Sequence, residues 1–434
     1  MMRAPTMSKI WSESSLQAML ARAGSHLPEW RSRRLKKFLT QGFPNRQIEN
    51  WKYTNVNSIA KNEFSFMPSA SIGPSALLRS IPGTYRLVFV NGCWVESLSH
   101  LPNEVEFNCL SENQQNACLS HLEMREVYQT PFSLLNDTLF SVVYQLRVPA
   151  GVHLAQPIHL VHRVESSTSH PTMTHLRHSF LVDENASATI FEEYVGRDGI
   201  TYFNNIVNQI ELKQNAQLKF YKLQHEGQEA FHIANTIVKQ DRDSRVETNV
   251  FSMGAKLSRD DLNFSLDESG ASAKLAGYYH AFQNNLADHH IRVDHRAPHC
   301  SSEQNYRGII DDKASAVFNG KILVHPNAVK THALQSNKNL LLSETAEINT
   351  KPELEIYADD VKCSHGATVG QLDEAALFYL RSRGVKEDEA RHLLTVAFAN
   401  EILELITDKA ITDVIRQTVL ERLMAPHLMK ELMP

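Results

Sequence analysis

Residues 185–195 read NASATIFEEYV, in which a turn residue and small side chains lead into a run typical of a β-strand. A similar start recurs at Asn215-Ala-Gln-Leu, Ser244-Arg-Val, Gly270-Ala-Ser-Ala, Lys313-Ala-Ser-Ala and Thr345-Ala-Glu-Ile. Successive starts lie 30, 29, 26, 43 and 32 residues apart. A β unit repeated about every thirty residues predicts a solenoid, with an insertion in the 43-residue step. A large β-sandwich is the alternative that this periodicity leaves open.

Strand patterns dominate residues 146–370. Alternating runs occur at Ala188–Val195, Gln217–Leu223, Ala273–Tyr279 and Ala316–Val324, and turn-type residues separate them. No helix-length periodic segment interrupts the series, which disfavours a doubly wound α/β fold because its parallel strands need crossover helices. We therefore predict a mainly β protein whose core is formed by residues 146–370.

Residues 1–145 are expected to form a helical and mixed N-terminal domain. An apolar pattern at helical spacing runs from Trp30 to Leu39, and Gly42 supplies a stop. Tyr85–Val90 (YRLVFV) and the Asn-Gly after it predict a strand and a turn. The basic run Arg31–Lys37 could suggest a nucleic-acid surface. The net charge of −5 instead favours a solvated helix face, and we expect no nucleic-acid partner.

Residues 371–434 are expected to form a C-terminal domain of amphipathic helices. One helix over Asp373–Arg381 ends before Gly384, and a third helix begins near Ile411. Such short helices bury too little apolar surface to be stable alone, so they should pack on the β region, on a partner or on both. The second helix, Glu387–Ile406, carries a broad apolar stripe made of Ala390, Leu393, Leu394, Ala397, Phe398, Ile402 and Leu405.

The composition indicates a reducing compartment. The five cysteines are odd in number and irregularly spaced, which argues against a disulfide framework. The first residues lack the apolar segment of a signal peptide, and no run approaches the ~18 apolar residues of a membrane span. We expect a soluble cytoplasmic protein with no membrane partner.

Common catalytic signatures are missing from the sequence. It contains no G-x-x-x-x-G-K-[ST] loop, whose backbone N–H groups would hold nucleotide phosphates. It also contains no G-x-G-x-x-G, G-x-S-x-G or H-E-x-x-H. We therefore expect no ATP binding through such a loop and no catalytic turnover by this chain.

Histidine is abundant, with 21 residues against five cysteines, and several histidines gather between residues 280 and 300. Imidazole, carboxylate and thiolate groups there could bind zinc or iron. In a strand, however, alternate residues face opposite sides, so His289 and His295 share one face and His290 takes the other. A polar ladder along the strands is therefore favoured. The alternative is a stand-alone metal-binding β protein or metalloenzyme that uses His289, His290, His295 and His299.

A second candidate site lies in the segment Asp359-Asp-Val-Lys-Cys-Ser-His-Gly366. Cys363 and His365 point to the same face of an extended strand, about 7 Å apart along it. Both side chains are suitable ligands for iron or zinc. Two ligands do not complete a site, so a second segment or chain must supply the rest. A buried thiol beside a hydrogen-bonded imidazole is the structural alternative.

Residues 363–384, CSHGATVGQLDEAALFYLRSRG, resemble the C-terminal signature of the SufB/SufD family, the non-ATPase scaffold subunits of the SUF iron–sulfur cluster assembly machinery. Gly42–Thr54 (GFPNRQIENWKYT), Leu87–Gly92 and Val293–Cys300 are similar to other motifs of that family. The Ser-His-Gly that follows Cys363 is typical of the SufD branch, since the SufB branch typically has Lys-His-Glu there.

The resemblance implies a right-handed parallel β-helix flanked by N-terminal and C-terminal helical domains. It also implies a complex with SufB, through the β-helix, and with the ABC-type ATPase SufC, through helices at about residues 372–406. The family's cluster-forming site lies where SufB and SufD meet, and its histidine corresponds to His365, with Cys363 as the neighbouring cysteine. We expect a transient iron–sulfur cluster in the assembled complex and no tightly bound cofactor in the isolated chain, which could form a homodimer.

Overall fold

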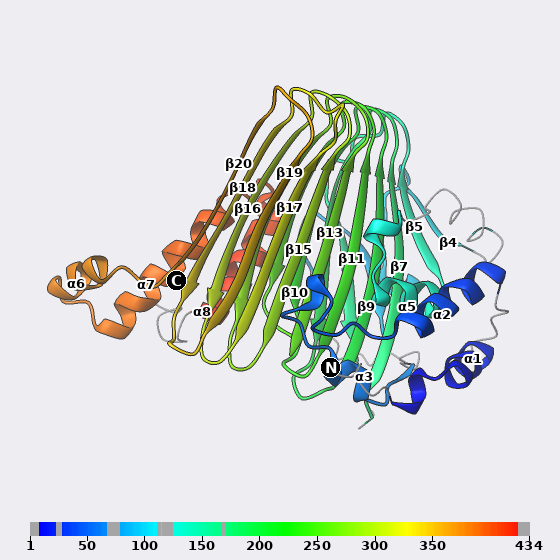
Figure 1. The fold of residues 1–434 in the computed structure, drawn as a ribbon, viewed down its shortest axis with the longest axis horizontal. Coiled ribbons are helices and arrows are strands. Elements are labelled where there is room, and N and C mark those ends of the chain that lie inside the picture. Colours follow the sequence, from blue (N-terminus) through cyan, green and yellow to red (C-terminus); the bar gives the residue numbers. More distant parts are fainter. Residues whose placement is uncertain are drawn as a thin grey trace.

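Two long parallel β-sheets face each other in the computed structural model, which describes residues 8–22, 28–66, 79–110, 114, 125–165 and 170–423 (Figure 1). In that part of the chain each sheet has ten strands. Sheet A contains β1 (Ser65–Phe66), β4 (Glu106–Leu110), β5 (Val143–Val148), β7 (Thr172–Val182), β9 (Tyr202–Leu212), β11 (Phe231–Gln240), β13 (Leu257–Leu266), β15 (Leu286–His295), β17 (Ser315–Val324) and β19 (Glu347–Ile356). Sheet B contains β2 (Tyr85–Val90), β3 (Cys93–Trp94), β6 (Ile158–Val164), β8 (Ser187–Gly196), β10 (Gln217–His225), β12 (Arg245–Ser252), β14 (Ser272–Ala281), β16 (Ser301–Ile310), β18 (His332–Leu341) and β20 (Lys362–Gly370).

Consecutive strands from β5 onward alternate between the two sheets, so the chain winds as a parallel β-helix. Each strand pairs in parallel with the strand one coil later, and a coil takes from 26 residues (Phe231 to Leu257) to 34 residues (Val143 to Arg177). Crossover helices are unnecessary because each connection only passes from one sheet to the other. The predicted solenoid is confirmed, and the β-sandwich alternative is wrong.

The sequence pattern predicted an insertion in the 43-residue step of the repeat. The structure shows instead that the repeat changes from sheet B to sheet A at this step. The starts at residues 185, 215, 244 and 270 precede β8, β10, β12 and β14, all in sheet B. The starts at residues 313 and 345 precede β17 and β19 in sheet A. The step therefore spans one coil and a half, and the coils on either side of it keep their ordinary length.

The left-handed backbone conformation of the turns explains why Asn, Asp and Gly recur at the start of the repeat. Asn185, Asn215, Asp243 and Gly270 precede strands of sheet B with φ of 57°, 58°, 55° and 78°. Asn, Asp and Gly adopt this conformation more readily than other residues do. His299 holds the same position before β16, with φ of 61°, so its place in the fold is a turn between coils.

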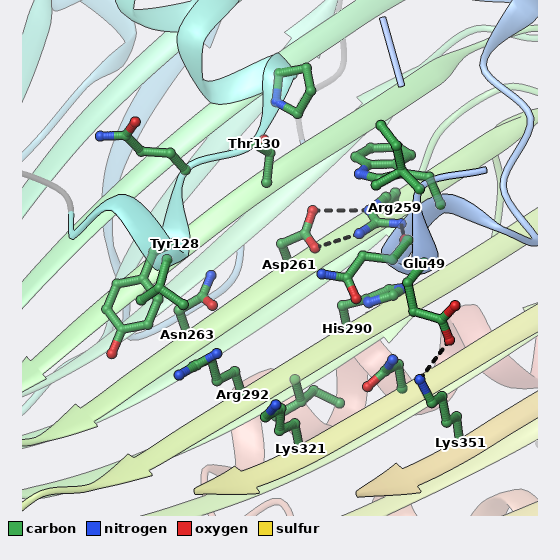
Figure 2. A pocket seen from close by; sticks show the side chains of 18 of the residues that line it. Glu49, Tyr128, Thr130, Arg259, Asp261, Asn263, His290, Arg292, Lys321 and Lys351 are labelled. Carbon is green, nitrogen blue, oxygen red and sulfur yellow. Dashed lines mark hydrogen bonds and ion pairs between the residues drawn. The ribbon is translucent and has the colours of Figure 1, made fainter. Parts of the chain in front are cut away.

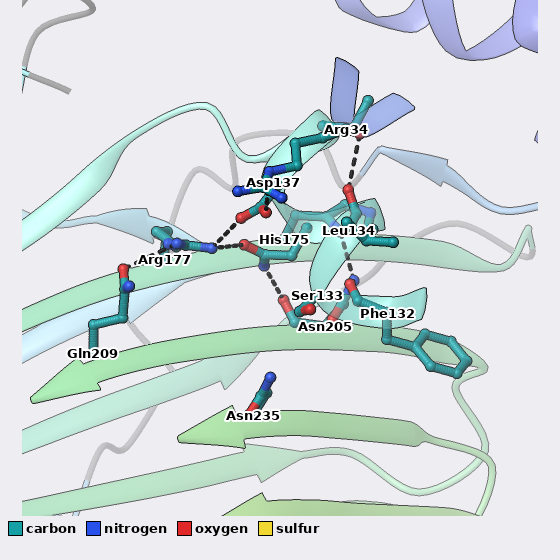
Figure 3. Close-up of polar contacts among 12 residues, drawn as sticks. Arg34, Phe132, Ser133, Leu134, Asp137, His175, Arg177, Asn205, Gln209 and Asn235 are labelled. Atoms are coloured by element: carbon teal, nitrogen blue, oxygen red, sulfur yellow. Dashed lines mark hydrogen bonds and ion pairs between the residues drawn. The ribbon is translucent and has the colours of Figure 1, made fainter. Parts of the chain in front are cut away.

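The N-terminal helices cover the outer face of sheet A (Figure 1). Helix α5 (Pro131–Leu139) is attached to β7 and β9 by buried polar contacts that Figure 3 shows. Arg177 on β7 donates to Asp137 at 2.5 Å and to Gln209 at 2.9 Å, and Asn205 on β9 donates to the Phe132 carbonyl at 2.9 Å. The remaining helices of this layer are α1 (Glu13–Arg22), α2 (Glu29–Gln41) and α3 (Asn57–Lys61).

The basic run on α2 is only partly a solvated face, because Arg33 and Lys36 are exposed but the other cations turn toward the protein. Arg31 is buried against the Phe140 ring, 4.3 Å from its centroid. Arg34 lies 3.4 Å from the Asp137 carboxylate, and Lys37 donates to Glu126 at 2.7 Å. These cations are spaced three residues apart, so they follow the helix face that packs on α5.

The C-terminal helices α7 (Glu387–Leu403) and α8 (Lys409–Leu423) pack on the outer face of sheet B, and α6 (Glu374–Ser382) lies beyond them (Figure 1). The stripe predicted on α7 is only partly correct. Ala390 and Ile402 are buried as predicted, but Leu393 and Leu405 are 38% and 41% exposed. The buried face is completed by Thr395, Ala399 and Leu403.

Among the helices of the described residues, none has the length and apolar character needed to cross a membrane.

Candidate functional site

The solenoid ends in two strands that have a neighbour on one side only. Within the described residues β19 pairs with β17 alone, and β20 pairs with β18 alone. No further coil covers them there, and all but one residue of β20 are exposed. Such an edge is a template for the addition of another strand.

The direction of the backbone hydrogen bonds shows which residues of β20 point their N–H and C=O groups toward the open edge. Lys362 donates its N–H to the Thr331 carbonyl on the β18 side at 2.9 Å. Because alternate residues of a parallel strand hydrogen-bond to opposite sides, the backbone groups of Cys363, His365, Ala367 and Val369 point away from β18. The strand therefore presents both its candidate ligands and its free backbone groups at the same edge.

Cys363 is half-buried at this end of the solenoid. Its side chain packs with Ala333, Leu354 and Val361 in a small apolar cluster. Burial raises the pKa of the Cys363 thiol, and a backbone contact at Ala333 only partly opposes this effect. The thiol is therefore protonated at neutral pH, and a nearby cation or metal ion is needed to favour the thiolate.

His365 is exposed and lies in register with Gln335 of β18. Strand alternation gives its side chain the same direction as that of Cys363, as the sequence predicts. No third His, Cys, Asp or Glu forms a metal-binding group with these two in the described part of the chain. A thiol and an imidazole are possible ligands for iron or zinc, but these two side chains alone do not make a complete metal site.

The structure separates the histidines of the alternative metal site. His289 and His295 are fully buried between the sheets, and six residues of extended strand hold them about 20 Å apart. His290 faces the other side of β15, where it contacts the Asp288 carboxylate at 3.0 Å. His299 is in a turn. The polar-ladder interpretation is correct, and these four side chains do not meet.

The motif Gly42–Thr54 lies across the outer face of sheet A and borders a cavity of about 660 Å³ (Figure 2). Trp51 stacks on the Arg259 guanidinium, 3.7 Å from the ring centroid to the Arg carbon. Arg259 is buried between Asp261 and Asp288, at 2.8 Å and 2.7 Å. Burial alone would raise the pKa of Asp288, but Arg259, followed by His290 and Thr54, lowers it below its ordinary value.

The same segment reaches the last coil. Glu49 accepts a hydrogen bond from Lys351 of β19 at 2.8 Å, and this contact lowers the pKa of Glu49 (Figure 2). The cations that line the cavity are already paired, for example Arg292 with Asp294 at 2.8 Å. The motif therefore attaches the N-terminal segment to the solenoid, which the sequence pattern alone does not reveal.

Sequence reasoning missed an exposed aromatic pair on α6. Phe378 and Tyr379 are 73% and 55% exposed, far more than most aromatic side chains of the chain. Leu393 of α7 is also exposed. Exposed apolar surface of this kind is typical of contacts between proteins. The adjacent pair itself gave no clear signal, since the consecutive Ile402 and Leu403 of α7 are both buried.

Comparison with known proteins agrees with this architecture. Residues 9–160 match the model of the SufBD protein N-terminal region, and residues 162–398 match that of the SufBD core domain of the SUF system for iron–sulfur cluster assembly. The iron–sulfur cluster assembly protein SufD of Escherichia coli (strain K12) is 33% identical over 393 residues, which cover 90% of each chain. An iron–sulfur cluster assembly SufBD family protein of Synechocystis sp. is 35% identical, over 87% of this chain and 86% of its own.

A plant relative, a chloroplastic protein of Arabidopsis thaliana, is 29% identical over 94% of this chain and 89% of its own. Both family models together span the N-terminal layer, the solenoid and most of α7. The chain therefore belongs to the SufBD family of iron–sulfur cluster assembly proteins.

Proposed function

We propose that this chain is the non-ATPase scaffold subunit of a SUF machinery, with no turnover of its own, and that it contributes Cys363 and His365 to the nascent cluster site. The observation that carries this proposal is the open edge of β20, which presents an incomplete pair of iron ligands beside free backbone groups. The cluster is cargo of the assembled complex. A compartment with reduced thiols, such as the cytoplasm, suits the four cysteines of the described residues, which form no disulfide with one another.

The proposed partner at the open edge is SufB. A SufB strand added beside β20 would satisfy the free N–H and C=O groups and bring further ligands next to His365. Without SufB, the same edge could pair with a second copy of this chain. Ile356 and Val369, 41% and 48% exposed, supply apolar surface for such a contact.

The proposed partner of the C-terminal region, residues 371–434, is the ATPase SufC. Phe378, Tyr379 and Leu393 offer an exposed apolar surface on α6 and α7. Residues 371–373 alone separate the end of β20 from the start of α6. A movement of α6 driven by ATP-dependent closure of SufC would therefore be transmitted directly to the strand that carries His365.

The test is a His365→Ala variant assayed in the reconstituted complex. We expect normal folding and complex formation but loss of bound iron and sulfide, because one ligand of the shared site is gone. His332→Ala is the matched control, since His332 is an exposed histidine on the neighbouring strand β18 whose side chain faces the opposite side.

Near-normal cluster formation by His365→Ala would remove this residue from the proposed site. Equal loss in His332→Ala would show that the effect comes from the strand end rather than from the imidazole. Circular dichroism and co-purification with SufB and SufC establish that each variant is folded and assembled.

A further inference from the structure

A second group of metal-ligating side chains lies inside the solenoid, far along the coils from the open end. His162 on β6, His178 on β7 and Glu192 on β8 project into the space between the sheets. Their side chains are 4%, 1% and 0% exposed. One ligand atom from each lies within 4.8 Å of the others, and no other such group occurs in the described residues.

The distances in this cluster match the edges of a metal coordination sphere. His162 Nε2 lies 3.4 Å and His178 Nδ1 lies 3.8 Å from the same oxygen, Glu192 Oε1. In a tetrahedral zinc site, metal–ligand bonds of about 2.0–2.2 Å place neighbouring ligand atoms about 3.3–3.5 Å apart. An ion between the three atoms would need only a small adjustment of the side chains.

Aromatic packing fixes the ring of His162, while the contact of its Nε2 with Glu192 stays longer than a good hydrogen bond, at 3.4 Å. Phe89 and Tyr194 both stack on the ring, with centroids 4.8 Å and 4.5 Å away and planes tilted by 17° and 14°. Neither ring nitrogen of His162 makes a hydrogen bond within the described part of the chain. A buried nitrogen without a partner costs about 1–3 kcal/mol, so the site is built around a missing partner.

Buried charge also favours a cation in this space. Three carboxylates in this space are at most 1% exposed, namely those of Glu192, Glu226 and Asp260. The buried ammonium group of Lys222 forms an ion pair with Asp260. Three buried carboxylates thus share one ammonium group and the His232 imidazole, which lies 2.7 Å from Glu226, and a divalent ion would reduce the buried negative charge.

We propose that His162, His178 and Glu192 form a resident site for a divalent transition-metal ion of the Zn²⁺ or Fe²⁺ class. Two imidazoles and one carboxylate are a donor set that both ions accept. The site is separate from Cys363 and His365 and does not depend on the scaffold role. It differs from the expectation that the isolated chain holds no tightly bound ion.

Neighbouring groups prepare the ligands for this ion. Asn208 donates to Glu192 Oε2 at 2.9 Å, and its Oδ1 lies 3.0 Å from His178 Nδ1. Metal binding at Nδ1 requires the Nε2–H tautomer, so the contact with Asn208 Oδ1 is exchanged for the ion.

Metal analysis of the full chain tests the proposal, after purification without a histidine tag. Because the ligands are enclosed, the chain is unfolded and refolded with Zn²⁺ or Fe²⁺ under anaerobic conditions, and excess ion is removed with a chelator. We expect a stoichiometric ion in the wild type. Glu192→Gln and His162→Gln should weaken binding at least about 10- to 100-fold, the loss seen when outer-shell partners of a metal are removed. Comparison of the two ions shows which one the site holds more tightly, and Zn²⁺ is expected to be favoured because N/O sites generally bind it more tightly than Fe²⁺.

Matched controls come from the outer face of the same sheet. Glu193 accepts hydrogen bonds from His159 and His225, each at 2.8 Å, so the same residue types are paired with each other there. Glu193→Gln and His225→Gln should keep the ion. Retention of the ion by Glu192→Gln, or equal loss in Glu193→Gln, would overturn the proposal.

A measurement on the wild type guards against variants that fail to fold. In a crystal of the refolded chain, an anomalous difference peak at the zinc or iron edge is expected between the two imidazole rings. Absence of that peak after refolding with both ions would overturn the assignment.

Discussion

Individual buried histidines give this protein a specific dependence on pH. Burial lowers the pKa of His280 and of His295 to about 4. In the unfolded chain these groups titrate near pH 6.5, so between about pH 6.5 and 4 the unfolded state binds more protons than the folded state. Their contribution to stability is therefore fully present above pH 6.5 and is lost as the pH falls through this window.

His295→Gln should make stability less sensitive to pH. The imidazole of His295 contacts Ser302 Oγ at 2.8 Å, and glutamine can keep a polar contact there without titrating. Each such histidine adds up to about 1.4 kcal/mol per pH unit to the slope, so the variant should lose about that much. Urea unfolding at several pH values between 4 and 7 measures it. Parallel curves for variant and wild type would contradict the assignment.

The direction of the candidate ligands was predictable, but their surroundings were not. Strand alternation alone places Cys363 and His365 on one face, and it separates His289 from His290. Whether these residues are enclosed depends on which coil is the last one. His289 has coils on both sides, whereas His365 has a neighbour on one side only, and no local pattern in the sequence carries that information.

At the scale of elements, glycine positions inside sheet B make room for stacked tyrosines. A Cβ atom on Gly277 would lie 2.0 Å from the Tyr306 ring, and one on Gly308 would lie 2.1 Å from the Tyr279 ring. Both rings are fully buried, so neither can move aside into solvent. These glycines are therefore required by packing between adjacent strands.

Gly277→Ala should destabilise the fold by about 1–3 kcal/mol, the usual range for overpacking in a core. Gly366→Ala on β20 is the matched control, because an added Cβ meets nothing within 4 Å there. Thermal or urea unfolding of both variants measures the difference. Equal stability of the two variants would show that the coils adjust to the extra methyl group.

Two phenylalanines of the C-terminal helices allow the packing of these helices to be separated from the proposed docking of SufC. Phe398 is half-buried under the Arg307 guanidinium, 5.2 Å from the ring centroid. Phe398→Asp should therefore cost about 0.5–3 kcal/mol of stability. Phe378→Asp should leave stability unchanged and weaken capture of SufC, because Phe378 is exposed. A pull-down combined with circular dichroism separates these effects, and normal capture by Phe378→Asp would move the docking surface elsewhere.

Element type was more predictable from sequence than element orientation. The strand predicted at Tyr85–Val90 is β2, and Asp373 caps α6 by accepting from the Ala375 N–H at 2.9 Å. The face of α7 was partly mispredicted because its apolar residues surround much of the helix. Small residues such as Ala399 let the helix approach sheet B, and this decided which side is buried.

At the scale of the whole molecule, the open edge predicts how a partner is recruited. The N–H of Ala367 faces away from β18, so Ala367→Pro removes one donor from the edge while leaving the ladder to β18 intact. We expect a folded chain that pairs poorly with SufB. Thr368→Pro is the control that breaks the ladder itself and lowers stability. Wild-type co-purification of Ala367→Pro with SufB would exclude strand addition at this edge.

The repeat spacing and the family resemblance indicated the solenoid before any coordinates, but not the layer that covers sheet A. Residues 42–54 carry a recognisable motif, yet their anchor points lie more than 200 positions away, at Arg259, Asp288 and Lys351. Contacts over such separations leave no periodic signal in a single sequence. Hence the fold was largely predictable, and the attachment of the N-terminal segment was not.

That covering layer changes how the coils depend on one another. A bare solenoid is a one-dimensional array in which each coil senses only its neighbours and the terminal coil frays first. Here two segments of the covering layer fasten separate coils: α5 contacts β7 and β9, whereas Trp51 contacts β13 and Glu49 contacts β19. Fraying at the open end must therefore also break the Glu49 contact, which ties the last coil to the N-terminal segment.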